Sequence, residues 1–398
     1  MARGHYRKGL GMNKRTSLIT TTCAALALAV AGMTPAIAHP GKGPGQVHSR
    51  TVAPLDSPRG VDALGNGRTL VTEGDGTFSL VVERPHAAAK VFKLGQLNTD
   101  FAPAIAMGRN HTIWLLTGGG EPPAARASTL GRQSTAAPAP PATLFKWRPG
   151  WAAPRAFADI AAYQATDPDP YDLEDFPEDS NPFGLAALWD GSVLVSDAAG
   201  NDLLRVFPDK HIVTVARLMP RVVAVPEGLP DIPPEEGGPF PPAGTMIPSE
   251  AVATSVTVGK DGYWYVGEHR GYPATPGKSQ IWRIKPGTTN ATCDPLKPWT
   301  RPCKRFADGL TSIVDLGAGW RGIYAVTLSK MSWLKMELGV PGSEIGGLFL
   351  VSKSHHSGHR HIKELVPDQL TMPSGVDVSD AVYVTGPIFG PGALMKIW

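Results

Sequence analysis

Apolar and polar residues alternate in short segments along most of this chain, and turn-forming residues separate the segments. Residues 181–207, NPFGLAALWDGSVLVSDAAGNDLLRVF, show the pattern most clearly. A short apolar strand ends at Asp190-Gly191, an alternating strand follows, and a turn at residues 198–201 leads into a third strand at 203–207. The pattern predicts an antiparallel sheet of short strands.

The same strand–turn–strand unit recurs along the chain. Aligned copies begin their first strand at Gly60, Ala104, Gly184, Ser255, Ser312 and Gly375. Between the copies lie further strand candidates at residues 79–83, 142–147, 212–218, 280–284, 348–352 and 394–398. Six copies with material for four strands each, and no long amphipathic helix, predict an all-β fold, a six-bladed β-propeller with four-stranded antiparallel blades. Two or three β-sandwiches in series are the alternative.

The last copy ends at Trp398 after its third strand, so its blade lacks a fourth. A strand from residues 47–52 would complete that blade and remove an exposed sheet edge. We therefore expect residues 39–398 to form one propeller domain. Segments rich in glycine, proline and alanine near 118–141 and 220–248 are expected to be flexible insertions, the second an extended, polyproline-like flap on the rim.

The amino-terminal segment has the pattern of an export signal. Five basic residues precede an apolar stretch at residues 18–33, and Ala36-Ile37-Ala38 follows as a cleavage site. The apolar stretch is too short and too interrupted by threonine for a permanent membrane span. Residues 1–38 are thus predicted to be a cleaved signal peptide, and the mature protein to be secreted.

Removing residues 1–38 changes the charge balance and the cysteine count. The mature chain would keep 33 basic and 35 acidic residues, a net charge of −2, with no dense basic segment that would follow a nucleic acid backbone. We therefore expect no nucleic acid partner. The two remaining cysteines, Cys293 and Cys303, flank a proline-rich loop, and an oxidising compartment favours a disulfide between them over zinc.

The repeat at VSDAAGNDLLRVF resembles the NHL-type propeller signature. The ordered series DIAAYQ, DSNPFGLAAL, DGSVLVSDAAGNDLLRV, TSVTVGKDGYWYVGE and LTSIVDL is similar to the ScyD/ScyE family of exported propeller proteins. The similarity covers essentially the whole mature chain. It implies a secreted six-bladed ring, in a family whose members mostly lack an assigned biochemical activity.

Carboxylates recur at one position of the repeat. Thirteen residues after the start of the first strand stand Glu73, Thr117, Asp197 and Glu268. With the side-chain oxygens of Asn181 and Asn201, the three carboxylates could coordinate Ca²⁺ at one face of the ring. The alternative for Asp197 is capping of its own turn, which needs no second blade. Glu73 and Glu268 are longer, so we expect them to be the better functional candidates.

Residues 167–179 form a strongly acidic run that leads into the third inner strand. Seven carboxylates occur in it, and prolines at 168, 170 and 177 exclude a regular helix. The spacing does not match an EF-hand loop. We interpret the run as a solvated acidic lip at a mouth of the propeller, with Asp172, Glu174 and Asp175 as candidate partner-binding residues and cation binding as the alternative.

A second cluster, SHHSGHRHIKEL, places four imidazoles at a hairpin tip: His355, His356, His359 and His361. It would bind transition metals, although exposed imidazoles also collect them adventitiously. Trp264, Tyr265, Trp282 and Trp333 are expected to pack in the core, with carbohydrate stacking as the alternative.

Two functions remain open. The sequence contains no G-x-S-x-G, H-E-x-x-H or P-loop motif. The first hypothesis is therefore a secreted binding or scaffold ring for an extracellular protein, glycan or small molecule. The second is a calcium-dependent lactonase or hydrolase with the cation over the channel. Similar lactonases open their first blade with a glutamate, where this chain has Arg59.

Overall fold

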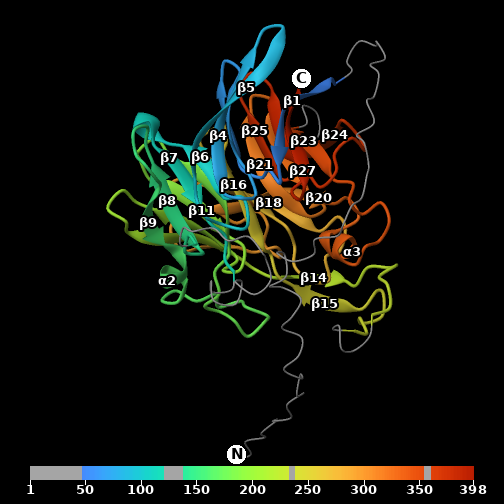
Figure 1. Cartoon of the computed structure of the whole chain (residues 1–398). Helices are drawn as coiled ribbons and strands as arrows, with labels where there is room; N and C mark the ends of the chain where they lie inside the picture. The colour runs from blue at the N-terminus through green and yellow to red at the C-terminus, as the bar shows by residue number, and fades with distance from the viewer. Residues whose placement is uncertain (1–46, 121–137, 233–237, 354–359) are drawn as a thin grey trace, which may run out of the picture.

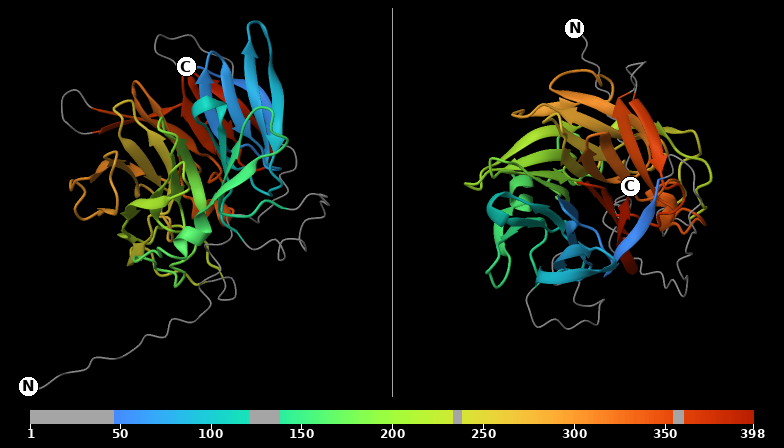
Figure 2. Two further views of the ribbon diagram at one scale, coloured as in Figure 1. Left: turned by 90° about the vertical axis from the view of Figure 1, so that its left-hand side faces the viewer. Right: turned by 90° about the horizontal axis from the view of Figure 1, so that it is seen from above.

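The computed structural model describes residues 47–120, 138–232, 238–353 and 360–398, and nearly all regular structure in them is β-strand. Six antiparallel four-stranded sheets follow one another along the chain. Their innermost strands contact one another in the order β2, β6, β10, β16, β21, β25 and back to β2. Figure 2 shows the sheets arranged around a ring. The fold is the six-bladed β-propeller that the repeat predicts, and sandwiches in series are excluded.

The first three blades run from the innermost to the outermost strand in chain order. Blade 1 comprises β2 (Val61–Gly65), β3 (Arg68–Thr72), β4 (Thr77–Arg84) and β5 (Ala87–Gln96). Blade 2 comprises β6 (Ala104–Met107), β7 (Ile113–Leu116), β8 (Thr143–Trp147) and β9 (Arg155–Asp159), with a 3-10 turn at Arg109–His111. Blade 3 comprises β10 (Pro182–Ala187), β11 (Val193–Asp197), β12 (Asp202–Val206) and β13 (Ile212–Leu218). A fifth strand, β19 (Ala291–Cys293), adds in parallel to β13.

The other three blades follow the same plan. Blade 4 comprises β16 (Ala253–Val258), β17 (Trp264–Glu268), β18 (Ser279–Ile284) and β20 (Cys303–Leu310). Blade 5 comprises β21 (Ile313–Gly319), β22 (Gly322–Thr327), β23 (Gly347–Lys353) and β24 (Arg360–Leu365). Blade 6 comprises β25 (Gly375–Val378), β26 (Val382–Gly386), β27 (Pro391–Ile397) and β1 (Ser49–Asp56). Outside the blades lie α2 (Ile160–Gln164), α3 (Trp333–Glu337) and the ribbon of β14 (Arg221–Ala224) with β15 (Met246–Ser249).

The ring is closed by the first strand of the chain. β1 pairs antiparallel with β27, with Ser49 opposite Ile397 and Asp56 opposite Pro391. The backbone N–H groups and carbonyls of His48 and Trp398 extend the pairing by two hydrogen bonds of 2.9 and 3.0 Å. The predicted closure is therefore confirmed, although the strand extends four residues beyond the predicted end at residue 52.

Local sequence explains the short strands and their packing. The Asn66-Gly67 pair between β2 and β3 has positive φ at both residues, which the twist of a two-residue hairpin requires. Alternating side chains fill the space between neighbouring sheets: Trp264 and Trp282 pack with Leu194 and Leu203 between blades 3 and 4. The four aromatic residues predicted to be core are at most 5 % exposed, which confirms that prediction.

The two faces of the ring differ in their connections. We call "turn face" the side where the first strand of each blade turns into the second, and "loop face" the opposite side, where the chain passes to the next blade. Most long insertions lie at the loop face, including α2, α3 and the β14–β15 ribbon at the bottom of Figure 1. The tip of the β4–β5 hairpin points the other way. One long connection, residues 285–302 with β19, instead joins the turn-face ends of β18 and β20.

Several predictions about segments and cysteines can be placed on this fold. The described ends of the 220–248 insertion pair as β14 and β15, so this part is a β-ribbon where a polyproline-like flap was predicted. The Cys293–Cys303 disulfide is present. It joins β19, at the edge of blade 3, to β20 of blade 4. The predicted signal peptide, residues 1–38, lies outside the described residues. In the described part of the chain, no helix is long and apolar enough to cross a membrane.

Candidate functional site

A cavity of about 320 Å³ occupies the middle of the ring. The innermost strands of all six blades line it, because the first strand of each sheet lies nearest the axis of the ring. Most of the lining residues are apolar, with Val61, Ile105, Leu185 and Val256 among them, but most of the surface that they expose to the cavity is polar. We call this cavity the channel.

Arg59 closes the channel at the loop face. Its side chain is 4 % exposed, and its guanidinium crosses the end of the channel to donate to the carbonyls of Ala102, at 3.0 Å, and Phe183. The guanidinium also lies 3.7 Å from the centre of the Phe183 ring, a cation–π contact. Burial lowers the pKa of Arg59 to about 10, so it remains charged at neutral pH. Blades 1, 2 and 3 are thereby joined by one side chain.

Exposure of the lining residues rises from the loop face to the turn face. Residues of the loop-face end are buried: Gly60, Val61, Gly184, Ser374 and Val376. Residues of the turn-face end are partly exposed: Ala63, Met107, Leu185, Ala187, Val258 and Val378. Lys260, beyond them on the turn of blade 4, is exposed. The channel therefore opens at the turn face, away from most of the long insertions.

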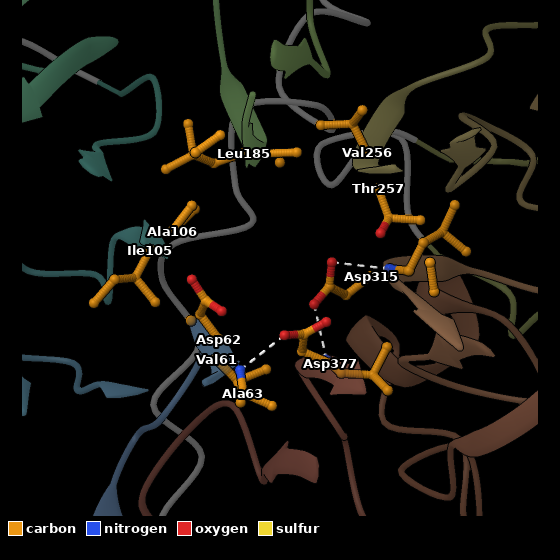
Figure 3. A pocket seen from close by; sticks show the side chains of 18 of the residues that line it. Val61, Asp62, Ala63, Ile105, Ala106, Leu185, Val256, Thr257, Asp315 and Asp377 are labelled. Atoms are coloured by element: carbon orange, nitrogen blue, oxygen red, sulfur yellow. Dashed lines mark hydrogen bonds between the residues drawn. The ribbon is translucent and has the colours of Figure 1, made fainter. Parts of the chain in front are cut away.

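Three aspartates project into the channel. Asp62 on β2, Asp315 on β21 and Asp377 on β25 point toward its middle in Figure 3, and all three are partly exposed there. Each also accepts a backbone N–H of the next blade: Asp62 from Met107, Asp377 from Ala63 at 2.8 Å, and Asp315 from Val376 at 2.8 Å. One oxygen of each carboxyl thus joins two blades. The other oxygen of Asp315 accepts the backbone N–H of Leu316 at 2.9 Å, so the second oxygens of Asp62 and Asp377 are the carboxyl oxygens that the channel offers.

The environment of these aspartates favours their protonated forms. Burial raises the pKa of Asp62 to about 8, and repulsion from Asp377 adds to the shift. Burial raises the pKa of Asp377 to about 6 and that of Asp315 to about 7, although Arg59 and two backbone N–H groups oppose the shift of Asp315. Repulsion between Asp62 and Asp377 opposes ionisation of both carboxyls, so the raised pKa values favour a pair that holds one proton near neutral pH. The channel can donate and accept protons in the physiological range.

The channel does not fit a calcium ion. Calcium takes six to eight oxygen ligands, mainly carboxylates that are fully ionised. Here, burial raises the pKa of all three aspartates and so favours their protonated forms. At least one oxygen of each is also bonded to a backbone N–H. Among the residues that the structure describes, no group of three or more His, Cys, Asp or Glu side chains is placed to hold a metal ion.

The channel aspartates were not among the residues predicted from the sequence. The predicted carboxylates end the second strands of their blades, whereas the aspartates lie in the middle of the first strands. A signal was present in copies 1, 5 and 6, where a valine followed by an aspartate places the aspartate two or three residues after the aligned strand start, as Val61-Asp62, Val314-Asp315 and Val376-Asp377. In an isolated strand, an aspartate beside apolar residues is typical of a solvent-facing position. Only the closure of the ring shows that the three aspartates meet.

The three carboxylates at the predicted equivalent position do not meet at the channel. Glu73, Asp197 and Glu268 end the second strands of blades 1, 3 and 4, and none of them is among the described residues that line the cavity. Asp197 is fully buried and accepts from the Ser180 hydroxyl at 2.6 Å and from the backbone N–H groups of Asn181 and Gly200 at 2.7 and 3.2 Å. The turn capping expected for Asp197 is therefore present.

Glu73 and Glu268 are also engaged in structural contacts. Glu73 accepts the backbone N–H of Asp56 at 2.9 Å, so its length lets it reach the end of β1 in the neighbouring blade. Glu268 is fully buried between Arg270, with which it forms an ion pair, and Trp282, whose indole N–H donates to it at 2.5 Å. Both oxygens of Glu268 are thus occupied. Glu73 thus bonds to a neighbouring blade and does not cap its own turn, and a functional role for Glu73 and Glu268 stays a prediction.

The two predicted asparagine ligands connect neighbouring loops. The Asn181 side-chain oxygen accepts the backbone N–H of Gly119 at 2.9 Å. The Asn201 side-chain oxygen accepts the backbone N–H of Val252 at 2.7 Å, and its amide donates to Asp169 at 3.0 Å. Both oxygens that were proposed for a cation therefore bind backbone groups. These contacts hold the loop face together around blade 3.

The acidic run is only partly solvated. Asp167 forms an ion pair with Arg217, and Asp169 is 4 % exposed. Farther along, Asp175 is exposed, whereas Asp172 and Glu174 are half-buried near Glu250. Glu250 accepts the backbone N–H of Leu173 at 2.8 Å; burial, and then repulsion from Glu174 and Asp172, raises its pKa to about 7. The run folds onto the loop face, where Arg59 separates it from the channel.

Of the predicted histidine cluster, His355, His356 and His359 lie outside the described residues. His361 lies on β24 and is exposed. The hypothesis of a transition-metal site at this hairpin stays a prediction.

The fold and the channel define a class, a six-bladed β-propeller with an accessible central channel. Solved structures with this architecture are similar to the chain. They include a PQQ-bound aldose sugar dehydrogenase from Streptomyces coelicolor, with 11 % identity, TM-score 0.47 and coverage of 89 % of this chain and 99 % of that one. A virginiamycin B lyase from Staphylococcus aureus has 11 % identity, TM-score 0.42 and coverage of 88 % and 98 %. A gluconolactonase from Xanthomonas campestris has 11 % identity, TM-score 0.47 and coverage of 89 % and 90 %.

At these identities and TM-scores the likeness carries no information about activity. No protein-family model matches the chain, and no curated protein matches it.

Proposed function

We propose that the protein is an exported binding propeller of the ScyD/ScyE type, which takes a small ligand into its channel from the turn face. The motif resemblance and the export signal predicted at residues 1–38 support export, and the Cys293–Cys303 disulfide fits an oxidising compartment. The absence of G-x-S-x-G, H-E-x-x-H and P-loop motifs from the sequence supports binding over catalysis.

The observation that carries this proposal is the placement of Asp62, Asp315 and Asp377 in a cavity open at one end. A volume of about 320 Å³ is at the small end of ligand pockets. Carboxyl oxygens in a cavity that is lined largely by apolar residues accept hydrogen bonds and attract positive charge. The ligand class that fits is therefore a small molecule that donates hydrogen bonds, in the first instance an amine.

Calorimetry with putrescine as the probe tests this proposal. An ammonium group favours ionised carboxylates, so binding should release protons, and affinity should increase at least tenfold between pH 5 and pH 8. Asp377→Asn should reduce affinity at pH 8 at least tenfold. Asp209→Asn, at an exposed aspartate outside the channel, is the matched control and should bind as the wild type does. Equal binding by Asp377→Asn and the control would refute a channel site.

A second candidate function is hydrolysis, because Asp62 and Asp377 face the same channel and their pKa values of about 8 and about 6 suit a general acid and a general base. One carboxyl would donate a proton to a leaving oxygen while the other accepts a proton from water. A chromogenic lactone series tests this candidate. Activity should disappear in both Asp62→Asn and Asp377→Asn and persist in the Asp209→Asn control. Turnover that survives both channel substitutions, or that is absent from the wild type, would exclude it.

A further inference from the structure

The rim of the channel at the turn face carries exposed tryptophans. Six turns between first and second strands form this rim: 66–67, 108–112, 188–192, 259–263, 320–321 and 379–381. Trp189 on blade 3 is 84 % exposed and Trp320 on blade 5 is 88 % exposed, whereas Trp114, Trp264 and Trp282 in the blades are at most 7 % exposed. An exposed indole ring makes little apolar contact with its own protein. Exposed aromatic rings of this size are typical of a binding surface.

The rim also has an excess of unpaired positive charge. Each rim aspartate is neutralised by a basic residue from a neighbouring strand: Asp190 by Arg205, Asp261 by Arg283 and Asp380 by Lys396. Arg109, Lys260 and Arg321 on the rim are exposed. None of these three forms an ion pair with a carboxylate of the described residues. The charge that the rim presents to a partner is therefore positive.

The two tryptophans and two of these cations, Lys260 and Arg321, lie on three successive blades. Lys260 stands on blade 4, between the blades of Trp189 and Trp320, and its ammonium lies 5.8 Å from the centre of the Trp320 ring. Arg321 follows Trp320 directly. Blade 3 thus presents one indole ring, blade 4 a cation, and blade 5 a second indole ring with a cation next to it in the sequence. A chain of sugar rings with acidic substituents matches both the indole rings and the charges.

We propose that this sector of the rim, Trp189, Lys260, Trp320 and Arg321, binds an anionic polysaccharide. Sugar rings would stack on the two indoles, and carboxylate groups between them would meet Lys260 and Arg321. The inference goes beyond the channel ligand and does not depend on it, because the sector lies outside the cavity apart from Lys260. It is independent of the acidic run at the other face, which an anionic polymer would avoid.

Binding to polygalacturonate, measured by calorimetry and by retardation in affinity gels, tests the proposal. The wild type should bind polygalacturonate and should bind neutral pullulan at least tenfold more weakly. The double variant Trp189→Ala/Trp320→Ala should lose at least tenfold in affinity, and so should Lys260→Gln/Arg321→Gln. Both pairs are exposed, so circular dichroism and thermal unfolding should match the wild type.

Three controls distinguish this sector from the channel, from the loop face and from simple charge attraction. Phe389→Ala, at an exposed aromatic residue of the loop face, should bind polygalacturonate normally, and so should Asp377→Asn in the channel. Polyglutamate, a polyanion without sugar rings, should bind at least tenfold more weakly than polygalacturonate. Equal binding of the two polymers would overturn the stacking role. Unchanged binding by the tryptophan pair, or association with phosphatidylglycerol vesicles in place of the glycan, would overturn the proposal.

Discussion

At the loop face, residues 160–181 and 219–252 make long connections, whereas at the turn face the innermost hairpins turn within two to five residues. The long connections carry most of the carboxylates that stand out in the sequence. Backbone N–H groups or arginine side chains bind many of these carboxylates. The short turns leave tryptophans and cations exposed around the open end of the channel. The long connections between blades therefore cover the loop-face end of the channel. The open end is surrounded by the short turns of the innermost hairpins, with their exposed tryptophans and cations.

The largest expected effect is on stability, and it compares two glutamates at the loop face. Glu268→Ala should reduce the free energy of unfolding by about 3–5 kcal/mol, because it leaves Arg270 buried without its charge partner. Glu73→Ala, at the equivalent repeat position in blade 1, should cost about 1 kcal/mol, because it removes one hydrogen bond from a half-exposed site. Urea unfolding of both variants measures the difference, and equal losses would contradict this assignment.

A somewhat smaller effect concerns the closed end of the channel. Arg59→Ala leaves the carbonyls of Ala102 and Phe183 without their donor and should cost about 2–3 kcal/mol. It should also admit water from the loop face, so hydrogen exchange at the backbone N–H groups of Gly60 and Val61 should accelerate. Arg109→Ala, at an exposed arginine of the turn face, is the control and should leave both quantities unchanged. Unchanged exchange in Arg59→Ala would mean that another group closes this end.

The smallest of the three effects is pH dependence. A carboxyl whose folded-state pKa is raised binds its proton more tightly in the folded than in the unfolded state, so its contribution to stability falls as pH rises from about 4 to the folded value. For Asp62 that value is about 8. Asp62→Asn should therefore match the wild type near pH 4 and be more stable by about 2 kcal/mol at pH 8, since one pKa unit corresponds to about 1.4 kcal/mol and channel water reduces the shift.

Thermal unfolding from pH 4 to pH 8.5 measures this dependence. Glu250→Gln at the loop face, where the pKa is about 7, should give a smaller gain that is complete by a lower pH. A stability difference that grows toward low pH would contradict the sign for either group.

The sequence was sufficient for most of the fold because the strands and turns within each blade are close together in the sequence. Period-two alternation and turn residues such as Asn66-Gly67 define the strands, and the missing fourth strand of the last copy led to the correct partner for β27. The site was not local. Asp62 in an isolated Val-Asp-Ala strand looks like a solvent-facing residue, and its meeting with Asp377 depends on closure between the two ends of the chain.

The prediction of a solvated acidic lip failed in part for the same reason. Asp167 and Asp169 look like the other acidic residues of their run, but Arg217 and Asn201 come from elsewhere in blade 3 and bind them. Trp189 and Trp320 belong to turns that were identified as turns, yet nothing in a single repeat indicates that two such turns flank one opening.

The pairing of β1 with β27 sets the order of events for a newly made chain. Blade 6 has its fourth strand among the earliest described residues and its other three among the last, so a nascent polypeptide cannot close the ring before β27 has been synthesised. Until then the channel does not exist, and the aspartates that face it are spread over separate strands. The proposed ligand site therefore forms only after synthesis of blade 6.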